Sequence, residues 1–186
     1  GFDQTIYSLD PTPMVWSKVA SQGPPHPGVV GHSMVLDTRN EVFLFFGGSV
    51  ANSSSTSNAV SVLDMKDGAK WTSKPTTGAV PNPLRDHVAV YHEPSHSMYV
   101  YGGETVGAHG SLRCVDQLHK LDLETWTWSL AASSAPMGQR SQLTAACVGD
   151  TMYLHGGLTI FAEKQTGTRD LWACHLPTLE WTLLSG

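Results

Sequence analysis

A pair of adjacent glycines recurs three times along the chain at nearly constant spacing. The pairs are Gly47-Gly48, Gly102-Gly103 and Gly156-Gly157, so the two intervals are 55 and 54 residues. A tryptophan follows each pair, at Trp71, Trp128 and Trp181, and an earlier one stands at Trp16. Self-similarity with a period near 50 residues is typical of propellers and solenoids. The sequence therefore predicts an array of one repeated unit.

The segments between the glycine pairs have the pattern of short strands. In the middle unit, short runs rich in aromatic and branched residues lie at 87–91, 98–101, 117–121 and 126–130, and turn formers separate these runs. Such runs are typical of antiparallel strands. No segment has apolar residues at helical spacing over three turns. We therefore predict an all-β chain built from four-stranded antiparallel units.

The repeated residues have mechanical roles in this interpretation. A Gly-Gly pair at the end of an inner strand lets the backbone adopt positive φ without a clash at Cβ. Each tryptophan gives the outermost strand a large apolar body that can pack against a neighbouring unit. An aspartate precedes three of the tryptophans by six or seven residues and can close the turn before the last strand. These aspartates are Asp10, Asp64 and Asp122.

Together these residues resemble the kelch repeat, which builds a β-propeller with one four-stranded blade per repeat. The matching parts are the Gly-Gly pair, a strand that ends in Leu-Asp, and the tryptophan. A start motif of the Arg/His/Ser type also recurs, in Gly31-His32-Ser33, Arg85-Asp86-His87 and Arg140-Ser141-Gln142. By spacing, Arg85 is in phase with Arg140, and His87 with Gln142. Departures are Val30 at the arginine position of the first repeat and His175 at the aspartate position of the last.

The resemblance implies about three and a half blades. Residues 1–19 would supply the two outer strands of one blade, and 28–74, 85–131 and 140–184 would form whole blades. Propellers close with about four to eight blades. We therefore expect a partial kelch propeller, completed by blades from a missing segment or from a second chain.

Composition narrows the class of partner and the compartment. Only 15% of residues are charged, the formal net charge is -5, and there is no run of lysine or arginine, so nucleic acid is not an expected partner. The longest apolar run, 42–46, is too short to insert into a membrane. Three cysteines without paired zinc spacing (Cys114, Cys147 and Cys174) favour a reducing, cytoplasmic setting. An Asn52-Ser53-Ser54 sequon keeps an extracellular alternative open.

The long connections are expected to carry function. A meander alternates direction, so the segments 49–59, 104–115 and 158–169 should all emerge on one face, and long loops on a rigid scaffold often bind partners. Ile160 and Phe161 form an apolar pair within a polar loop and could be an interface anchor. Four arginines could line a pocket for acidic peptide groups, although two of them hold repeat positions that also suit structural pairing. The predicted partner-binding residues are Arg85, His109, Arg113, Arg140, Ile160, Phe161, Lys164 and Arg169.

The sequence favours a binder over an enzyme. The kelch resemblance includes copper radical oxidases, whose chemistry needs tyrosine and histidine ligands converging on one face with a thiolate nearby, but the histidines here scatter. His92 and His96 could face each other across a turn and hold a metal, as many surface loops can. We expect a non-catalytic scaffold, adaptor or substrate receptor that binds a protein or peptide without cofactor or metal. The period and long loops resemble long-loop kelch proteins more than compact BTB-kelch adaptors. The alternatives are a propeller enzyme of the copper oxidase or sugar-modifying type, and an extracellular attractin-like adhesion or receptor module.

Overall fold

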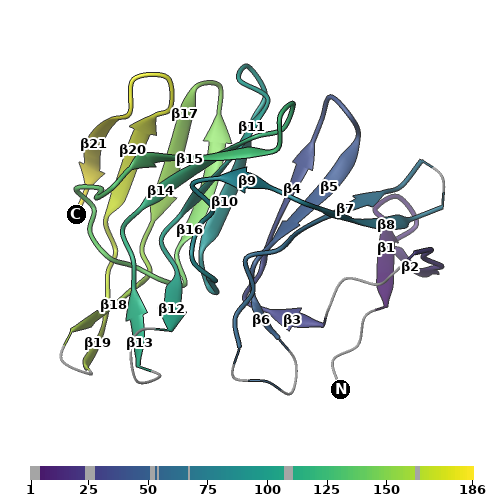
Figure 1. The fold of residues 1–186 in the computed structure, drawn as a ribbon, viewed down its shortest axis with the longest axis horizontal. Coiled ribbons are helices and arrows are strands. Elements are labelled where there is room, and N and C mark those ends of the chain that lie inside the picture. The colour runs from purple at the N-terminus through teal and green to yellow at the C-terminus, as the bar shows by residue number, and fades with distance from the viewer. Residues whose placement is uncertain are drawn as a thin grey trace.

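Three four-stranded antiparallel meanders stand side by side in a computed structural model of the chain (Figure 1). The structure describes residues 5–23, 28–50, 53, 55–66, 68–106, 111–161 and 164–186, and within these ranges every regular element is a strand. The prediction of an all-β chain is confirmed.

The strands group by sequence order. An N-terminal hairpin is formed by β1 (Ile6–Asp10) and β2 (Val15–Val19). The first meander contains β4 (Ser33–Asp37), β5 (Val42–Phe46), β7 (Val60–Asp64) and β8 (Lys70–Lys74). The second contains β10 (Val88–His92), β11 (Ser97–Tyr101), β14 (Leu118–Asp122) and β15 (Thr127–Ala132), and β9 (Thr77–Gly78) lies parallel to β15. The third contains β16 (Thr144–Val148), β17 (Thr151–His155), β20 (Leu171–His175) and β21 (Glu180–Ser185).

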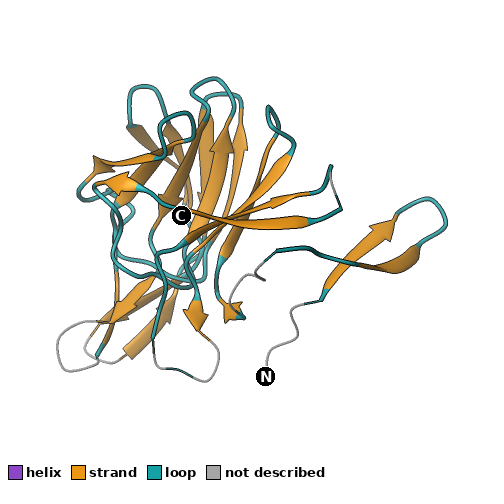
Figure 2. Cartoon of the chain, turned by 45° about the vertical axis from the view of Figure 1, so that its right-hand side comes forward, coloured by secondary structure: helices purple, strands orange, loops and turns teal. Residues whose placement is uncertain are grey.

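The segments expected as long loops contain further strands. The pairs are β3 (Val29–Val30) with β6 (Ser49–Val50), β12 (Glu104–Val106) with β13 (Leu112–Cys114), and β18 (Leu158–Phe161) with β19 (Lys164–Gly167). These three ribbons project from the same side of the meanders, at the lower edge of Figures 1 and 2. The tight connections, such as the one between β16 and β17, lie at the opposite edge. We call the ribbon side the hairpin face and the other side the turn face.

Apolar layers between consecutive sheets form the core. Phe46 of the first meander packs on Trp128 of the second with ring centroids 5.0 Å apart, and Tyr101 of the second packs on Trp181 of the third at 5.6 Å. Trp71 lies in a smaller cluster with Ile6 and Val19 of the N-terminal hairpin. Each tryptophan of a whole meander thus contacts the element that precedes it. Because the second meander is covered on both faces, every residue of β11 is buried.

The glycine pairs and turn aspartates act as the sequence predicts. Gly103 has φ +95°, and a Cβ on it would lie 2.7 Å from the carbonyl oxygen of Arg85 and from Cβ of His87, so only glycine fits this crossing. Asp64 and Asp122 accept backbone hydrogen bonds from the residues that follow them, at 2.8–3.0 Å. In the last meander His175 occupies this position, and its Nδ1 lies 2.9 Å from the side-chain hydroxyl of Thr178.

The phase assigned to the start motif was wrong by one residue in the third meander. Backbone bonds run from Asp86 N to Gly31 O (2.7 Å) and from Gln142 N to Asp86 O (2.8 Å), and all three residues have positive φ. The counterpart of Arg85 is therefore Ser141, and Arg140 corresponds to Leu84. Spacing alone concealed this because the β16–β17 turn has two residues where the β10–β11 turn has four.

Candidate partner-binding face

Arg85 lies at the base of the hairpin face, where it pairs with a glutamate of the β12–β13 ribbon and its Nη1 lies 3.5 Å from the hydroxyl of Ser49 on β6. Its Nε and Nη2 donate to Oε2 of Glu104 at 3.0 and 2.9 Å, and only 5% of the Glu104 side chain is exposed. Ser141, the counterpart of Arg85 in the next meander, donates to Oε1 of the same carboxylate at 2.9 Å. The two start positions thus meet on one buried acid, which ties the third meander to the base of β12.

Arg140 is committed to an internal ion pair. It forms a two-pronged pair with Asp170, and its Nη2 lies 2.8 Å from Oδ2 of that residue. Its Nε donates to the carbonyl of Met137, and its Nη1 donates to Thr168. Hydrogen bonds from Arg140 lower the pKa of Asp170 to about 2, while burial opposes the shift. Arg140 is only 6% exposed, so its guanidinium fixes the base of the β18–β19 ribbon.

The remaining predicted residues lie on the ribbons themselves. Arg113 on β13, Lys164 on β19 and Arg169 just beyond β19 are all exposed, and Ile160 on β18 is half-buried. Phe161 pairs with Lys164 through the backbone, and its side chain lies outside the described set. His109 also lies outside the described residues. The four arginines therefore divide into two internal pairs and two exposed cations on different ribbons.

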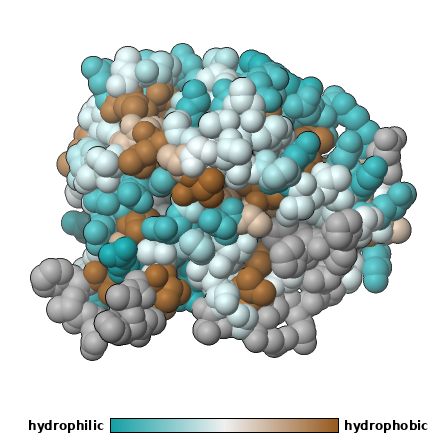
Figure 3. Space-filling view, in the orientation of Figure 1, coloured by the Kyte–Doolittle hydropathy of each residue, from teal (hydrophilic) through white to brown (hydrophobic). Residues whose placement is uncertain are grey.

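The ribbons also expose apolar side chains that the sequence analysis did not select. Val106 and Leu112 sit opposite each other in the β12–β13 register, and each is 42% exposed. Val30 on β3 is exposed as well. Brown apolar patches are visible along this lower edge among polar and grey atoms (Figure 3). The missed signal was weak, since each residue is a single apolar position in a strand of two or three residues.

On the turn face, the two histidines of the β10–β11 turn bind different neighbours. His92 lies 2.9 Å from Asp150 of the third meander and 2.7 Å from Ser95. His96 lies 3.0 Å from Asp37 of the first meander. The predicted possibility that both faced a shared metal is therefore wrong. Among the described residues, no group of three or more His, Cys, Asp or Glu side chains has the arrangement of a metal site.

The arrangement of Ser95, His92 and Asp150 has the residue types of a hydrolytic triad, but its local setting explains it as a turn closure. Asp37 holds the matching place at the end of β4 and closes its own turn by accepting from the backbone of Arg39 and the side chain of Asn40. His92 closes the next turn on Ser95 in the same way. Its second nitrogen then reaches Asp150, which joins two meanders.

Comparison with known proteins matches this architecture to a family. The model of the KLHDC2/KLHL20/DRC7 Kelch-repeats domain matches residues 39–186, which is most of the chain. The chain belongs to the kelch-repeat family. The Gly-Gly turns, the buried tryptophans and the four-stranded meanders are the features of that family found in the structure.

Individual relatives are longer than this kelch chain. It is 32% identical over 214 residues to human Host cell factor 2, covering 98% of the chain and 26% of that protein. It is 31% identical over 161 residues to rat Multiple epidermal growth factor-like domains protein 8, covering 84% of the chain and 6% of the relative. It is 33% identical over 115 residues to bovine Rab9 effector protein with kelch motifs, covering 61% and 29%. Across the described residues, no helix is long and apolar enough to cross a membrane.

Proposed function

We propose that this kelch domain is a non-catalytic protein-interaction module whose hairpin face binds a partner protein or peptide. The observation that carries the proposal is the set of three ribbons projecting from one side of a rigid stack of sheets (Figure 2). Their bases are fixed by the Arg85–Glu104 and Arg140–Asp170 pairs, so the ribbons are presented in defined positions. A preorganised surface loses less conformational entropy on binding.

The chemistry of the ribbons suits a partner with both apolar and acidic groups. Val106 and Leu112 offer exposed apolar surface on the β12–β13 ribbon. Ile160 is half-buried on the β18–β19 ribbon, which follows it in the chain. Exposed cations flank these residues, at Arg113, Lys164 and Arg169. Aromatic and arginine side chains surrounded by near-neutral contacts that exclude water carry most of the binding energy of many interfaces, and the apolar residues here would supply such water-excluding contacts. The name of the bovine relative, a Rab9 effector, describes a protein that acts through another protein, which supports a binding role here.

The test is capture of proteins from a cell extract by three immobilised chains. The first is the unmodified chain, the second carries Val106→Asp with Leu112→Asp, and the third carries Met65→Asp, an exposed residue in the β7–β8 turn of the turn face. A protein retained by the first and third chains and lost by the second supports the proposal. Equal retention by all three, with each variant folded by circular dichroism, contradicts it.

Phe161→Ala provides a narrower test of the expected anchor. We expect the variant to weaken capture of the same partner without lowering the melting temperature. A clear fall in melting temperature would instead make Phe161 a packing residue of its own ribbon.

For the compartment we propose the cytoplasm, with an extracellular location as the alternative. Cys114, Cys147 and Cys174 are free thiols in the structure, and Cys114 and Cys174 are buried. Secreted domains commonly pair their cysteines, whereas reducing compartments keep them free. Mass spectrometry of the native protein with and without a thiol-alkylating reagent after denaturation would count the free thiols.

A further inference from the structure

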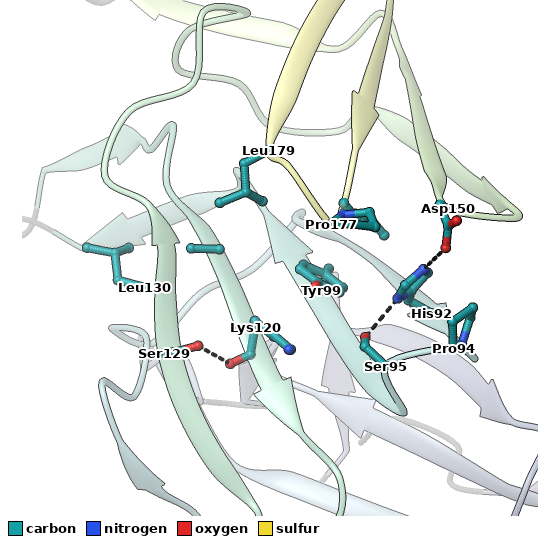
Figure 4. Close-up of a pocket in the computed structure, with 12 residues that line it drawn as sticks. His92, Pro94, Ser95, Tyr99, Lys120, Ser129, Leu130, Asp150, Pro177 and Leu179 are labelled. Atoms are coloured by element: carbon teal, nitrogen blue, oxygen red, sulfur yellow. Dashed lines mark hydrogen bonds and ion pairs between the residues drawn. The ribbon is translucent and has the colours of Figure 1, made fainter.

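A cleft of about 540 Å³ opens on the turn face between the second and third meanders. Its volume lies in the range of about 300–1,000 Å³ that is usual for ligand sites. Tyr99 lies in its centre, with Lys120 on one side and Pro177 and Leu179 on the other (Figure 4). Leu130, on the outer strand β15, also lines the cleft. The cleft therefore combines one cation with an aromatic ring and aliphatic side chains.

The repeats explain why the cleft exists here. In the second meander Trp126 stands two residues before Trp128, with φ +56°, and it packs on the core between the first two sheets. The matching residue of the third meander, two before Trp181, is Leu179 with φ +59°. The same backbone position thus holds a bulky indole at one interface and a smaller leucine at the next. The cleft lies where the leucine leaves space that an indole would fill.

Two further differences accompany the loss of the indole. At the first interface the ammonium of Lys74 lies 4.8 Å from the Trp126 ring centroid, and the register places Ala132 at the position of Lys74. Val62, which is buried in the first core layer, is replaced in register by Lys120. Compared with the first interface, the interface between the second and third meanders therefore lacks the indole that covers the core and has a lysine in place of a buried valine.

The cation on this wall lacks a carboxylate partner within the described part of the chain. Lys120 forms none of the ion pairs found there, and its ammonium lies 6.0 Å from the Tyr99 ring centroid. The carboxylate of Asp150 at the rim is already held by His92 at 2.9 Å. Lys120 affects Asp122 only by a charge interaction, which contributes to the lowered pKa of that group after the backbone bond from Thr125. An arriving carboxylate would supply the missing partner.

We propose that this cleft binds an acidic peptide segment, with a carboxylate on Lys120 and an apolar side chain between Leu130 and Leu179. The site lies on the turn face and is separate from the hairpin face of the proposed function. The walls are already in place, since Leu176 at the base is buried and its backbone nitrogen is bonded to Asp150 at 2.8 Å. The proposed ligand is a peptide because a peptide can present a carboxylate and an apolar side chain together, which matches Lys120 and the leucines Leu130 and Leu179 that line the cleft.

The test is a nuclear magnetic resonance titration of the isotope-labelled chain with a blocked heptapeptide that alternates leucine and glutamate. We expect saturable shifts at the backbone amides of Lys120, Ser129, Leu130 and Leu179. A matched peptide with glutamine in place of glutamate should bind roughly fivefold more weakly, which corresponds to about 1 kcal/mol for a partly exposed ion pair. The absence of saturable shifts, or equal binding of the two peptides, would overturn the proposal.

Two variants locate the site. Leu179→Trp restores the residue type found at Trp126 on the same left-handed backbone, and it should fill the cleft and weaken binding by more than about tenfold. Met65→Trp, at an exposed position on the turn face of the first meander, should leave binding unchanged. If Leu179→Trp does not fold, Lys120→Gln replaces it and should remove the preference for glutamate. Undiminished binding in a folded Leu179→Trp chain, or a preference that survives Lys120→Gln, would show that the cleft is not the site. The double variant Val106→Asp with Leu112→Asp should bind the peptide normally, which separates this site from the hairpin face.

Discussion

At the scale of single residues, His96 is the side chain that links two meanders most completely. It is 4% exposed, and its ring nitrogens contact Asp37 at 3.0 Å and Glu124 at 2.8 Å. Arg39 extends the link by donating to the carbonyl of Glu93. Burial alone would lower the pKa of His96, but the hydrogen bonds that its ring donates to the two carboxylates, together with their negative charges, outweigh burial and raise it. The pKa of Asp37 is lowered, because its bonds to His96 and Asn40 outweigh its burial.

These shifts predict the pH dependence of stability. A histidine whose folded pKa is raised contributes stability that is complete below its unfolded pKa, near 6.5, and is lost as pH rises through the folded value. Asp37 contributes stability above its unfolded pKa that is lost as pH falls. His87 acts in the opposite direction from His96, since burial lowers its pKa to about 3. The effect of His96 must therefore be isolated by comparing the wild-type chain with a variant.

We expect His96→Gln to destabilise the chain most at about pH 6 and progressively less toward pH 9. The measurement is the free energy of unfolding in urea at a series of pH values, for both chains. A difference between them that stays constant from pH 6 to 9 would mean that folding does not raise the pKa of His96.

Trp128 is expected to be the most costly side chain to remove. It is 1% exposed and packs on Phe46 across the layer between the first two meanders. Trp128→Ala should lower the free energy of unfolding by about 3–5 kcal/mol. Trp16 holds the matching place in the N-terminal hairpin but is 65% exposed, so Trp16→Ala should change stability by less than about 0.5 kcal/mol. Similar losses for both variants in urea denaturation would refute this assignment of the core layers.

At the scale of elements, the Gly-Gly turn determines how each ribbon leaves its meander. Gly103 needs both a left-handed backbone and the absence of a Cβ, because Arg85 and His87 cross it closely. Gly138 has a similar φ of +78°, but a Cβ on it would meet nothing within 4 Å. Substitutions at Gly103 and Gly138 therefore separate the cost of a left-handed backbone from the cost of steric overlap at Cβ.

We expect Gly138→Ala to cost about 1–2 kcal/mol from the left-handed backbone alone. Gly103→Ala should cost about 1–3 kcal/mol more, because the added methyl group overlaps its neighbours. Thermal or urea unfolding of the two variants measures both values. If the two substitutions cost the same, the close crossing at Gly103 does not constrain the fold.

The sequence predicts the strands of the meanders well and the ribbons poorly, for a physical reason. Strands such as β11 and β14 have five residues each and were located within one or two positions, and β11 contains the strong β-formers Tyr99, Val100 and Tyr101. The β12–β13 ribbon has strands of three residues, which is too short for an alternating pattern to stand out. The Arg85–Glu104 pair depends on a contact between segments 19 residues apart. The cleft arises from a difference between Trp126 and Leu179 that gains meaning only once the meanders are aligned in space.

At the scale of the whole molecule, the two ends of the stack expose apolar sheet surface. The N-terminal hairpin exposes Tyr7, Met14, Val15 and Trp16, and the third meander exposes Val148, Tyr153, Leu183 and Leu184. At the other interfaces the corresponding faces are buried against a neighbouring sheet. Contiguous apolar surface of this kind promotes association. We propose that further blades, from the same polypeptide or from a second copy, cover these faces.

This proposal predicts how the isolated chain behaves in solution. Light scattering at several concentrations should give a mass that rises above the 20.0 kDa of one chain as concentration increases. Trp16→Lys with Leu183→Lys should hold the mass near that of a monomer. A monomeric wild-type chain at all concentrations would show that the exposed faces do not associate.

Hydrogen exchange tests whether the partner binds on the hairpin face. The partner recovered by the capture experiment would be added to the chain, and amide exchange would be followed by mass spectrometry. We expect slowed exchange in the ribbons, at residues 104–106, 112–114, 158–161 and 164–167. Slowed exchange confined to the turn face, at residues 93–96, 149–150 and 176–179, would contradict it.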